Sequence, residues 1–312
     1  LMPLAKRVRN QIRFSRSGQP SSLQMIENSI QSPDLRALAG QRSVYADLGG
    51  STLHLGEIEI LAGGEIKVLW QRDDIKLDAY ISKGGPELFD FIAQNIVDTV
   101  KARSKNAGQK QIMGFTFSFP HKNGRILKKA QGVKGFNFKG VIGRNILKLV
   151  NDRLDKFGMP DLKAVVVTND TEGALVQGKL LFKNALVSVI AGSGFNTAIW
   201  LLGRMFNMES GGLAIPREWL SAHDRRVMKR GAEELIAGKF LGEMLRVRLE
   251  YLAKKQGLFG GKVSKKLQAY EGISSKVVTR IYAAGDQKEI RSILRGIGIK
   301  NASPQDIKIV KR

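Results

Sequence analysis

The order of strand, glycine-turn and helix patterns is the feature that most constrains the fold of this chain. Residues 43–47 predict a short buried strand that runs into Asp47-Leu48-Gly49-Gly50. A hairpin follows, in which residues 53–60 pair with residues 65–70 across a glycine turn. A second strand-to-glycine opening comes at Gly192-Ser193-Gly194. Strand hairpins followed by alternating helices and strands are typical of the α/β class, and two similar openings predict two related lobes facing a cleft.

Apolar periodicity places the other elements. Residues 86–103 and 145–157 carry apolar side chains at helical spacing, and the first begins with Pro86. After Glu209 the chain is mostly helical to its end. We expect the following further elements: strands at 112–117, 165–167, 186–191 and 196–202, with 165–167 buried, and a helix at 171–181.

Short blocks of polar residues and glycine lie at the ends of these elements. They are Asp47-Leu48-Gly49-Gly50-Ser51-Thr52, Phe115-Thr116-Phe117-Ser118-Phe119-Pro120, Lys134-Gly135-Phe136, Thr168-Asn169-Asp170-Thr171, Gly192-Ser193-Gly194-Phe195-Asn196, Asn207-Met208-Glu209 and the segment from Glu233 to Glu243. Glycine turns let backbone N–H groups approach phosphate oxygens. A carboxylate at hydrogen-bond distance from a hydroxyl can act as a general base. Each block alone is a weak signal, but their number and order are specific.

In this order, the blocks resemble the hexokinase family from about Ser43 to nearly the end of the chain. The resemblance implies the two-lobed, actin-like (ribonuclease-H-like) α/β fold, with sugar and nucleotide bound in the cleft. It predicts a basic N-terminal arm or helix over 1–42, a small lobe over 43–168 and a large lobe over 169–312 whose fold is incomplete.

The resemblance also implies roles for individual residues. Asp170 is expected to be the general base that accepts the proton of the sugar 6-hydroxyl. The expected sugar-binding residues are Ser118, Lys134, Asn169, Asn207, Glu209 and Glu233. The expected phosphate-binding residues are Asp47, Gly49, Gly50, Ser51, Gly192, Ser193 and Gly194. A purely structural interpretation stays open, in which Asn169-Asp170-Thr171 caps the following helix and Glu233 is a surface acid.

Several positions depart from the family pattern. Thr52 and His54 stand where the family has Asn and Arg, and a mostly neutral His cannot replace a bidentate phosphate partner. Val133 stands in place of a sugar-binding Thr, and Ser210 in place of a Trp. The sequence ends at Arg312, before counterparts of the family's later nucleotide-binding turns. These departures predict a retained sugar half and an impaired nucleotide half.

The charge of the chain favours a polyanionic partner. Lys and Arg number 51 against 28 Asp and Glu, a net charge of +23. No acid occurs between Asp98 and Asp152. The cations that we predict to contact RNA lie in this stretch: Lys101, Arg103, Lys105, Lys110, Lys122, Arg125, Lys128, Lys129, Lys139, Arg144 and Lys148. A solvated surface with no such partner is the alternative.

The N-terminal residues 1–26 also lack acids and are rich in Arg and Ser, which suits import into the mitochondrion. The alternatives are a basic arm on a partner or a plain surface helix, with the cytoplasm as the location. The sequence has no apolar run long enough to span a membrane, so no membrane association is expected. It has no cysteine, and its three histidines are far apart in sequence, so no metal site is expected.

These observations leave three hypotheses for function. The first, which charge and departures favour, is a catalytically degenerate hexokinase-like subunit of a ribonucleoprotein, plausibly the mitochondrial ribosome, that binds rRNA and needs no cofactor. The second is an ATP-dependent hexokinase that uses ATP and Mg²⁺. The third is a sensor that binds a hexose weakly without turnover.

Overall fold

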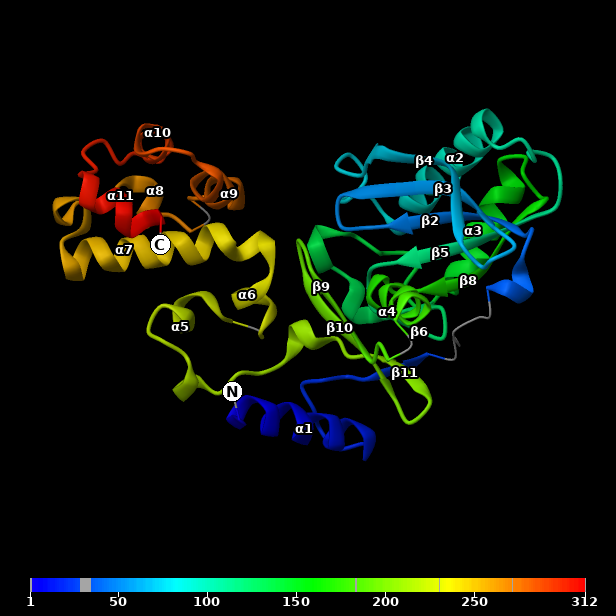
Figure 1. Cartoon of the computed structure of the whole chain (residues 1–312), viewed down its shortest axis with the longest axis horizontal. Coiled ribbons are helices and arrows are strands. Elements are labelled where there is room, and N and C mark those ends of the chain that lie inside the picture. The colour runs from blue at the N-terminus through cyan, green and yellow to red at the C-terminus, as the bar shows by residue number, and fades with distance from the viewer. Residues whose placement is uncertain (1, 29–34, 183, 230, 271, 312) are drawn as a thin grey trace. The chain divides into compact units, whose positions relative to one another are not determined.

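The computed structural model describes residues 2–28, 35–182, 184–229, 231–270 and 272–311. The described residues form strands and helices of an α/β fold, as predicted (Figure 1). They group by contact into two units. The sheet unit comprises Met25–Val189 and Thr197–Met208, and the helical unit comprises Leu1–Gln24, Ile190–Asn196 and Glu209–Arg312. The lobe boundaries predicted at 42/43 and 168/169 stay predictions, because this grouping reflects contacts alone.

A five-stranded sheet forms the centre of the sheet unit, in the order β4-β3-β2-β5-β8. In the predicted hairpin β3 and β4 are antiparallel, and the neighbouring β2 is antiparallel to β3. On the other side of β2, β5 and then β8 continue the sheet in parallel. The strands are β2 (Arg42–Leu48), β3 (Thr52–Ile60), β4 (Ile66–Lys76), β5 (Gln111–Phe117) and β8 (Leu162–Thr168). Because β2, β5 and β8 are parallel, their carboxyl ends lie on the same side of the sheet, and the polar residues that follow them gather there.

Helices α2 (Gly85–Arg103) and α3 (Ile146–Lys156) pack together and contribute to the core of this sheet. The apolar positions of α2 recur at helical spacing, so that Leu88, Phe89 and Ile92 are all fully buried. Asn145 caps the N-terminus of α3 by accepting a hydrogen bond from the Lys148 N–H at 2.9 Å. Both helices confirm the periodicity read from the sequence.

The predicted burial of residues 165–167 is wrong. They lie in β8, but Val165 is 53% exposed and Val166 38% exposed. Strand β8 forms the edge of the sheet, with Leu162 and Ala164 as its buried residues. An apolar run cannot by itself distinguish a central strand from an edge strand, because both suit β-branched residues.

A second sheet has the order β1-β11-β10-β9. Its strands are β1 (Ile26–Asn28), β9 (Val187–Ala191), β10 (Phe195–Leu201) and β11 (Arg204–Asn207). A two-stranded hairpin of β6 (His121–Lys122) and β7 (Arg125–Ile126) turns at Asn123 and Gly124, both of which have positive φ angles. Helix α4 (Asp170–Leu181) follows β8.

The helical unit begins with the predicted basic helix, α1 (Met2–Arg16), and then contains mainly short helices. These are α5 (Asp224–Val227), α6 (Glu233–Ile236), α7 (Leu241–Gln256), α8 (Lys265–Gln268), α9 (Ser275–Ala283), α10 (Gln287–Gly296) and α11 (Pro304–Lys311). Short 3₁₀ turns in the chain are η1 (Arg36–Leu38), η2 (Lys128–Ala130), η3 (Val133–Gly135), η4 (Ser210–Gly212), η5 (Arg217–Trp219), η6 (Gly238–Phe240) and η7 (Leu258–Gly261). The core that α7 shares with α8–α11 is aliphatic, including Leu249, Leu267 and Leu294.

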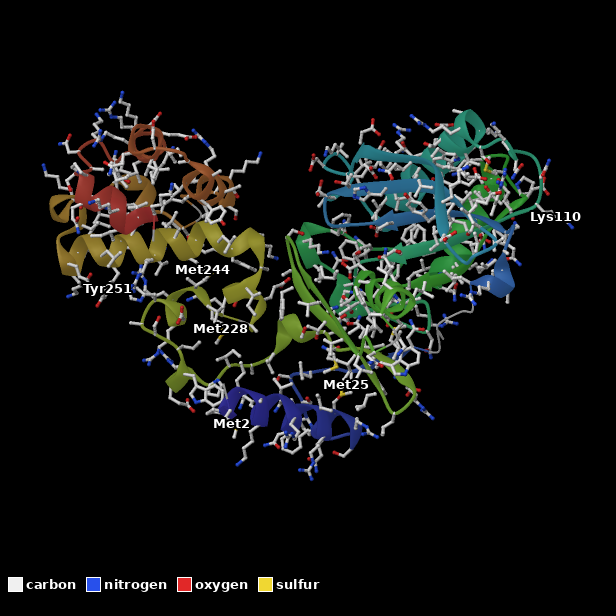
Figure 2. All side chains as sticks on the ribbon, viewed as in Figure 1. Met2, Met25, Lys110, Met228, Met244 and Tyr251 are labelled. Atoms are coloured by element: carbon white, nitrogen blue, oxygen red, sulfur yellow. The ribbon has the colours of Figure 1, made fainter. Side chains whose placement is uncertain are left out.

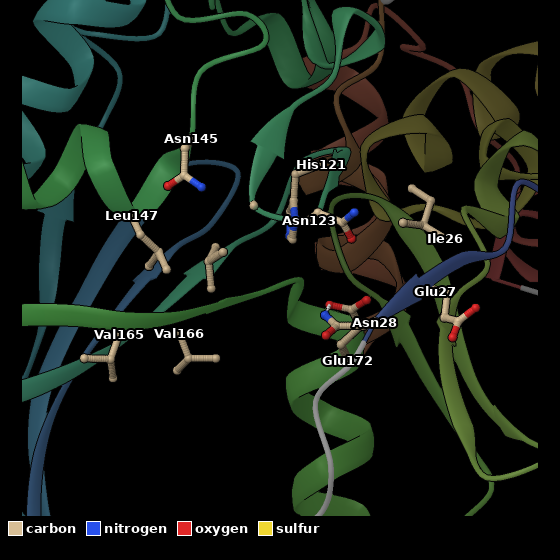
Figure 3. Close-up of a pocket in the computed structure, with 12 residues that line it drawn as sticks. Ile26, Glu27, Asn28, His121, Asn123, Asn145, Leu147, Val165, Val166 and Glu172 are labelled. Atoms are coloured by element: carbon tan, nitrogen blue, oxygen red, sulfur yellow. Dashed lines mark hydrogen bonds between the residues drawn. The ribbon is translucent and has the colours of Figure 1, made fainter.

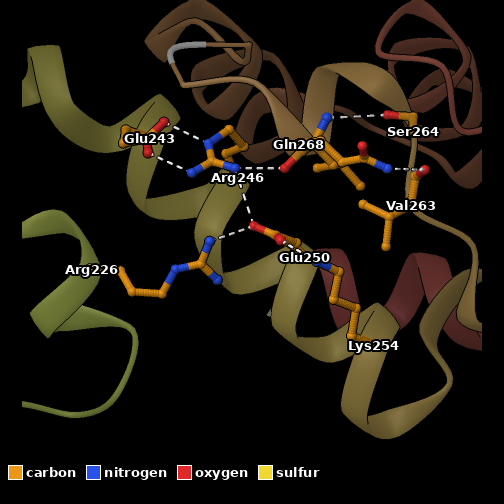
Figure 4. Close-up of polar contacts among 9 residues, drawn as sticks. Arg226, Glu243, Arg246, Glu250, Lys254, Val263, Ser264 and Gln268 are labelled. Carbon is orange, nitrogen blue, oxygen red and sulfur yellow. Dashed lines mark hydrogen bonds and ion pairs between the residues drawn. The ribbon is translucent and has the colours of Figure 1, made fainter.

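A buried charge network lies on α7 (Figure 4). Arg246 is 5% exposed and donates two hydrogen bonds to Glu243, both of 2.7 Å, and one to Glu250 at 3.2 Å. It also donates to the Leu267 carbonyl oxygen at 2.6 Å, which ties α7 to α8. Arg226 and Lys254 reach Glu250 from the surface, each at 2.6 Å. The buried arginine thus has both carboxylate and carbonyl partners, as a charge in a protein interior needs.

Candidate functional site

The glycine turn after β2 holds the first predicted phosphate-binding residues. The Gly49 N–H donates to the Thr52 carbonyl oxygen at 3.0 Å, which closes the turn between β2 and β3. The N–H groups of Gly50 and Ser51 donate to no other described residue. These two amides are therefore available to an anion, as a phosphate-binding turn requires.

Asp47 lies beside this turn with an unmet bonding capacity. Its Oδ1 atom is buried and has no hydrogen-bond partner among the described residues. Burial raises the pKa of the Asp47 carboxyl, and the nearby Asp170 carboxylate raises it further, while His54 and Lys134 partly offset both effects. An unpartnered buried carboxylate oxygen beside a glycine turn is typical of a ligand site, since a bound donor would satisfy it.

Ser118 and Lys134 meet at the end of β5. The Ser118 N–H donates to the Leu48 carbonyl oxygen at 3.2 Å, which joins the ends of β5 and β2. The Lys134 ammonium group donates to the Ser118 carbonyl oxygen at 3.3 Å and lies 5.1 Å from the centre of the Phe119 ring. Lys134 has a left-handed backbone conformation, with φ of 53°. A cation is thereby held beside the site of Asp47.

The start of α4 positions Asn169 and Asp170. Asn169 is the N-cap, and its side-chain oxygen accepts a hydrogen bond from the Thr171 N–H at 3.1 Å. One Asp170 oxygen, Oδ1, also accepts from that N–H, at 2.8 Å. Glu172 completes a capping box by accepting from the Asn169 N–H at 2.8 Å. Asp170 therefore has two roles in the structure. It supports the start of α4, and its carboxylate acts electrostatically on Asp47.

Glu172 is the site residue that the sequence reasoning missed. It is buried, and its Oε2 atom also accepts hydrogen bonds from the Asn28 amide at 2.8 Å and the Thr168 hydroxyl at 3.2 Å. The signal was present in the sequence, because Asn169-x-x-Glu172 before an apolar stretch is a capping-box pattern. Its long-range partner Asn28 could not be found from that pattern.

The other predicted residues are placed as follows. Asn207 is buried at the end of β11, in the sheet unit. In the helical unit, Glu209 precedes η4 in a left-handed conformation, and Glu233 accepts a hydrogen bond from the Phe195 N–H at 3.3 Å. The Gly192 carbonyl oxygen accepts a hydrogen bond from the Gly238 N–H at 2.7 Å. The predicted sugar-site residues thus divide between the two units.

The cations of the acid-free stretch are mostly exposed, but Lys129 is only partly so. Lys110 extends away from the loop after α2 (Figure 2). Others have partners within the protein: Arg125 donates to the Gly143 carbonyl oxygen at 3.1 Å, and Lys148 pairs with Asp152 at 2.9 Å. Because these residues come from α2, the β6–β7 hairpin, η2 and α3, their joint contact with RNA stays a prediction.

A pocket of about 220 Å³ lies elsewhere in the sheet unit, against β1, β8 and the β6–β7 hairpin (Figure 3). Glu172 and its partner Asn28 line this pocket, but none of the predicted sugar-binding or phosphate-binding residues does. His121 lines it and is 6% exposed. Burial lowers the pKa of His121 to about 4, although the backbone of Thr168 partly offsets this effect. Its imidazole is therefore neutral at physiological pH.

The described residues contain neither a metal-ligand cluster nor a membrane-spanning helix. No group of three or more His, Cys, Asp or Glu side chains there could hold a metal ion. Within the same residues, no helix is both long and apolar enough to cross a membrane.

Family models support what the geometry suggests. One model described as hexokinase matches residues 4–180, and a second matches residues 203–312. The chain belongs to the hexokinase family. The predicted resemblance is therefore confirmed.

Among related proteins, hexokinase-2 of Oryza sativa is 28% identical over 297 residues, which cover 85% of this chain and 60% of that protein. Human hexokinase-2 is 28% identical over 282 residues, covering 81% of this chain and 30% of the human protein. This hexokinase-family chain thus spans less than two thirds of the length of these relatives.

Solved structures confirm the predicted hexokinase fold. A Schistosoma mansoni hexokinase complexed with glucose matches with a TM-score of 0.75 and 24% identity, over 93% of this chain and 71% of that one. A second solved hexokinase has a TM-score of 0.74 and 19% identity, over 99% and 75%. The solved structures thus show the fold of this chain, and the family models show its family.

Proposed function

We propose that this hexokinase-family chain transfers the γ-phosphoryl group of ATP to the 6-hydroxyl of a hexose such as glucose. The observation that carries the proposal is the placement of Asp170 at the start of α4, within electrostatic reach of Asp47 at the glycine turn. Lys134 acts on the same carboxylate. The solved structure of the schistosome hexokinase with glucose supports a hexose as the substrate.

In the proposed reaction, the Asp170 carboxylate accepts the proton of the hexose 6-hydroxyl. The hydroxyl oxygen attacks the γ-phosphorus, the bond from that phosphorus to the β-phosphate oxygen breaks, and ADP leaves. In this proposal Mg²⁺ would enter with ATP as part of the substrate. It neutralises charge on the phosphate oxygens.

Electrostatics favours Asp170 over Asp47 as the base. The pKa of Asp47 is raised, first by burial and then by Asp170. Two neighbouring carboxylates resist simultaneous ionisation, so burial and the nearby Asp170 together make Asp47 hold a proton more readily than an ordinary Asp. Asp47 can hydrogen-bond a ligand through its unpartnered Oδ1, while Asp170 is the residue to which the family resemblance assigns the role of base. Ser118, Lys134, Asn169 and Asn207 of the sheet unit carry polar groups suited to sugar hydroxyls, and the family resemblance implies the same role for Glu209 and Glu233.

A coupled assay of ADP release with glucose, mannose and fructose tests the proposal. We expect turnover by the unchanged chain and a loss of about 10²–10⁴-fold on Asp170→Asn, because the general base is removed while the helix-capping oxygen remains. Asp152→Asn is the matched control, since Asp152 is exposed and pairs only with Lys148 among the described residues. Full activity of Asp170→Asn would reduce Asp170 to a helix cap.

Absence of ADP release by the unmutated chain would contradict the proposed kinase function. Isothermal calorimetry with glucose then decides between the other hypotheses. Binding without turnover supports the hexose sensor, and absence of binding leaves the ribonucleoprotein hypothesis.

RNA binding remains the second candidate, because a net charge of +23 and the acid-free stretch favour a polyanion. Its partners would be rRNA and ribonucleoprotein proteins, and its proposed location the mitochondrion. Binding to a structured RNA should weaken steeply with salt and after Lys122→Glu, Lys128→Glu and Lys129→Glu are combined. A flat salt dependence contradicts this candidate.

A further inference from the structure

A row of polar side chains crosses three strands of the five-stranded sheet beside the glycine turn. Asp47 on β2 pairs in register with His54 on β3. The flanking residues Leu53 and Leu55 are fully buried in the core with α2, so His54 projects from the opposite face of β3. A register irregularity places Asp73 of β4 beside His54.

Asp73 fixes one end of the His54 ring. The His54 Nδ1 atom lies 2.9 Å from the Asp73 Oδ1 atom, so Nδ1 carries the proton and donates it. The Gln71 amide donates to the other Asp73 oxygen at 2.7 Å, which holds the carboxylate in place. No hydrogen bond joins His54 Nε2 to any of the described residues. A ring held at Nδ1 presents Nε2 as an acceptor when neutral and as a donor when protonated.

The charged and titratable groups around His54 come from each neighbouring strand. Asp47 lies on one side and Asp73 on the other, and Tyr45 of β2 faces the same region. Burial raises the pKa of the Tyr45 hydroxyl, and Asp73 and Asp47 raise it further, so this hydroxyl stays neutral. Lys134 acts on Asp47 from η3, and Asp170 acts on it from α4. Among these groups, His54 contributes an imidazole, which is neutral with one ring proton and cationic with two.

The glycine turn next to β3 offers further groups that can bind an anion, in addition to His54. The N–H groups of Gly50 and Ser51 donate to no described residue, and His54 is two residues from the start of β3 that follows this turn. Free backbone amides beside a group that can become cationic suit phosphate oxygens.

We propose that His54, oriented by Asp73, binds the phosphate chain of the nucleotide in its protonated form and makes phosphate binding stronger at acidic than at alkaline pH. The proposal rests on the proposed kinase function for the identity of the ligand. A fixed guanidinium at this position could not respond to pH in this way, because it never deprotonates in the physiological range.

Histidine NMR can test the proposal directly, because the whole sequence contains three histidines. The full chain, labelled at histidine, is titrated from pH 5 to 8 with and without inorganic tripolyphosphate. Coupling between the bound anion and one proton should move the His54 midpoint to higher pH by roughly half a unit or more. His54→Gln identifies its signal, and His121 serves as the internal control because burial lowers its pKa to about 4, below the titrated range.

Tripolyphosphate affinity, measured by calorimetry, provides the second readout. We expect the affinity for tripolyphosphate to fall about three- to tenfold between pH 6 and pH 8. A tenfold fall corresponds to a shift of about one pH unit in the midpoint of the proton linked to binding. His54→Gln should remove this dependence, and His54→Arg should restore tight binding at both pH values. Asp73→Ala should weaken the dependence by freeing the ring. An unmoved His54 midpoint, an unchanged pH dependence in His54→Gln, or no binding at pH 6 would overturn the proposal.

Failure of the kinase function gives a different result. A shift of His54 without any ADP release leaves the phosphate site in place and removes the kinase function. ADP release whose KM for ATP is independent of pH keeps the kinase and overturns the role of His54.

Discussion

Replacing Glu172 by Ala should uncouple the start of α4 from the residues that position it. Glu172 is 2% exposed, and its Oε2 atom accepts hydrogen bonds from Asn169, Asn28 and Thr168 at 2.8, 2.8 and 3.2 Å. These contacts join β8, α4 and β1, and the Asn169–Asp170 pair stands at their centre. The substitution therefore affects both the stability of the sheet unit and the geometry of the proposed base.

The magnitude follows from the number and type of bonds lost. Hydrogen bonds to a charged group contribute about 1.5–3 kcal/mol each, but the buried carboxylate loses hydration that offsets part of this. Loss of a capping interaction costs about 0.5–2 kcal/mol. Because the three donors share one oxygen, the contributions are not additive, and we expect a net loss of about 2–4 kcal/mol in the free energy of unfolding. Glu172→Gln, which keeps an acceptor oxygen, should lose about half as much.

Urea unfolding followed by tryptophan fluorescence measures this loss, since Trp70 and Trp200 both lie in the sheet unit. Asp152→Ala is the control, because an exposed i,i+4 pair contributes about 0.3–0.5 kcal/mol. In the ADP-release assay, Glu172→Ala should lower kcat by about ten- to a hundredfold, since small displacements of a catalytic group are costly. A stability change below about 1 kcal/mol would refute the reasoning that these bonds hold the helix start.

Three further predictions follow from other groups. Asp47→Asn should stabilise the protein at neutral pH and lower its activity. Because the pKa of Asp47 is raised in the folded state, its ionised form destabilises the fold, and the gain in stability should vanish as pH falls below the ordinary range of Asp. Thermal melts of both proteins at pH 7 and pH 3.5 measure this difference. Arg246→Ala should cost about 3–5 kcal/mol in urea unfolding, since it removes both hydrogen bonds from Arg246 to the buried Glu243 carboxylate and one of the three cations that contact Glu250. A loss under about 1 kcal/mol would contradict the buried network. Burial alone would raise the pKa of Glu250, but hydrogen bonds from Lys254 and Arg226 outweigh burial and lower the pKa to about 2. The stability that the ionised Glu250 contributes should therefore be present above about pH 4.5 and be lost progressively toward pH 2. Glu250→Gln should lose less stability over this pH range, because it has no carboxylate to protonate.

Local pattern was enough to place the regular elements around the site. The residues that form α2, α3 and the β3–β4 hairpin were predicted because their apolar spacing reports which face of each element is buried. The capping role of Asn169 was foreseen as an alternative, since a cap depends on residues within one helical turn. The exposure of Val165 was not foreseen, because it depends on β8 having a neighbour on one side only.

The order of the motifs in the sequence determined the family, and with it the fold and the identity of the candidate residues. Only the tertiary structure decided which of those residues interact: that Asp47 lies near Asp170, that Glu172 meets Asn28 and that His54 pairs with Asp73. Asp47 and Asp170 are brought together because parallel β2, β5 and β8 end at one edge of the sheet. Electrostatic coupling depends on distance and burial, and neither quantity is set by separation along the chain.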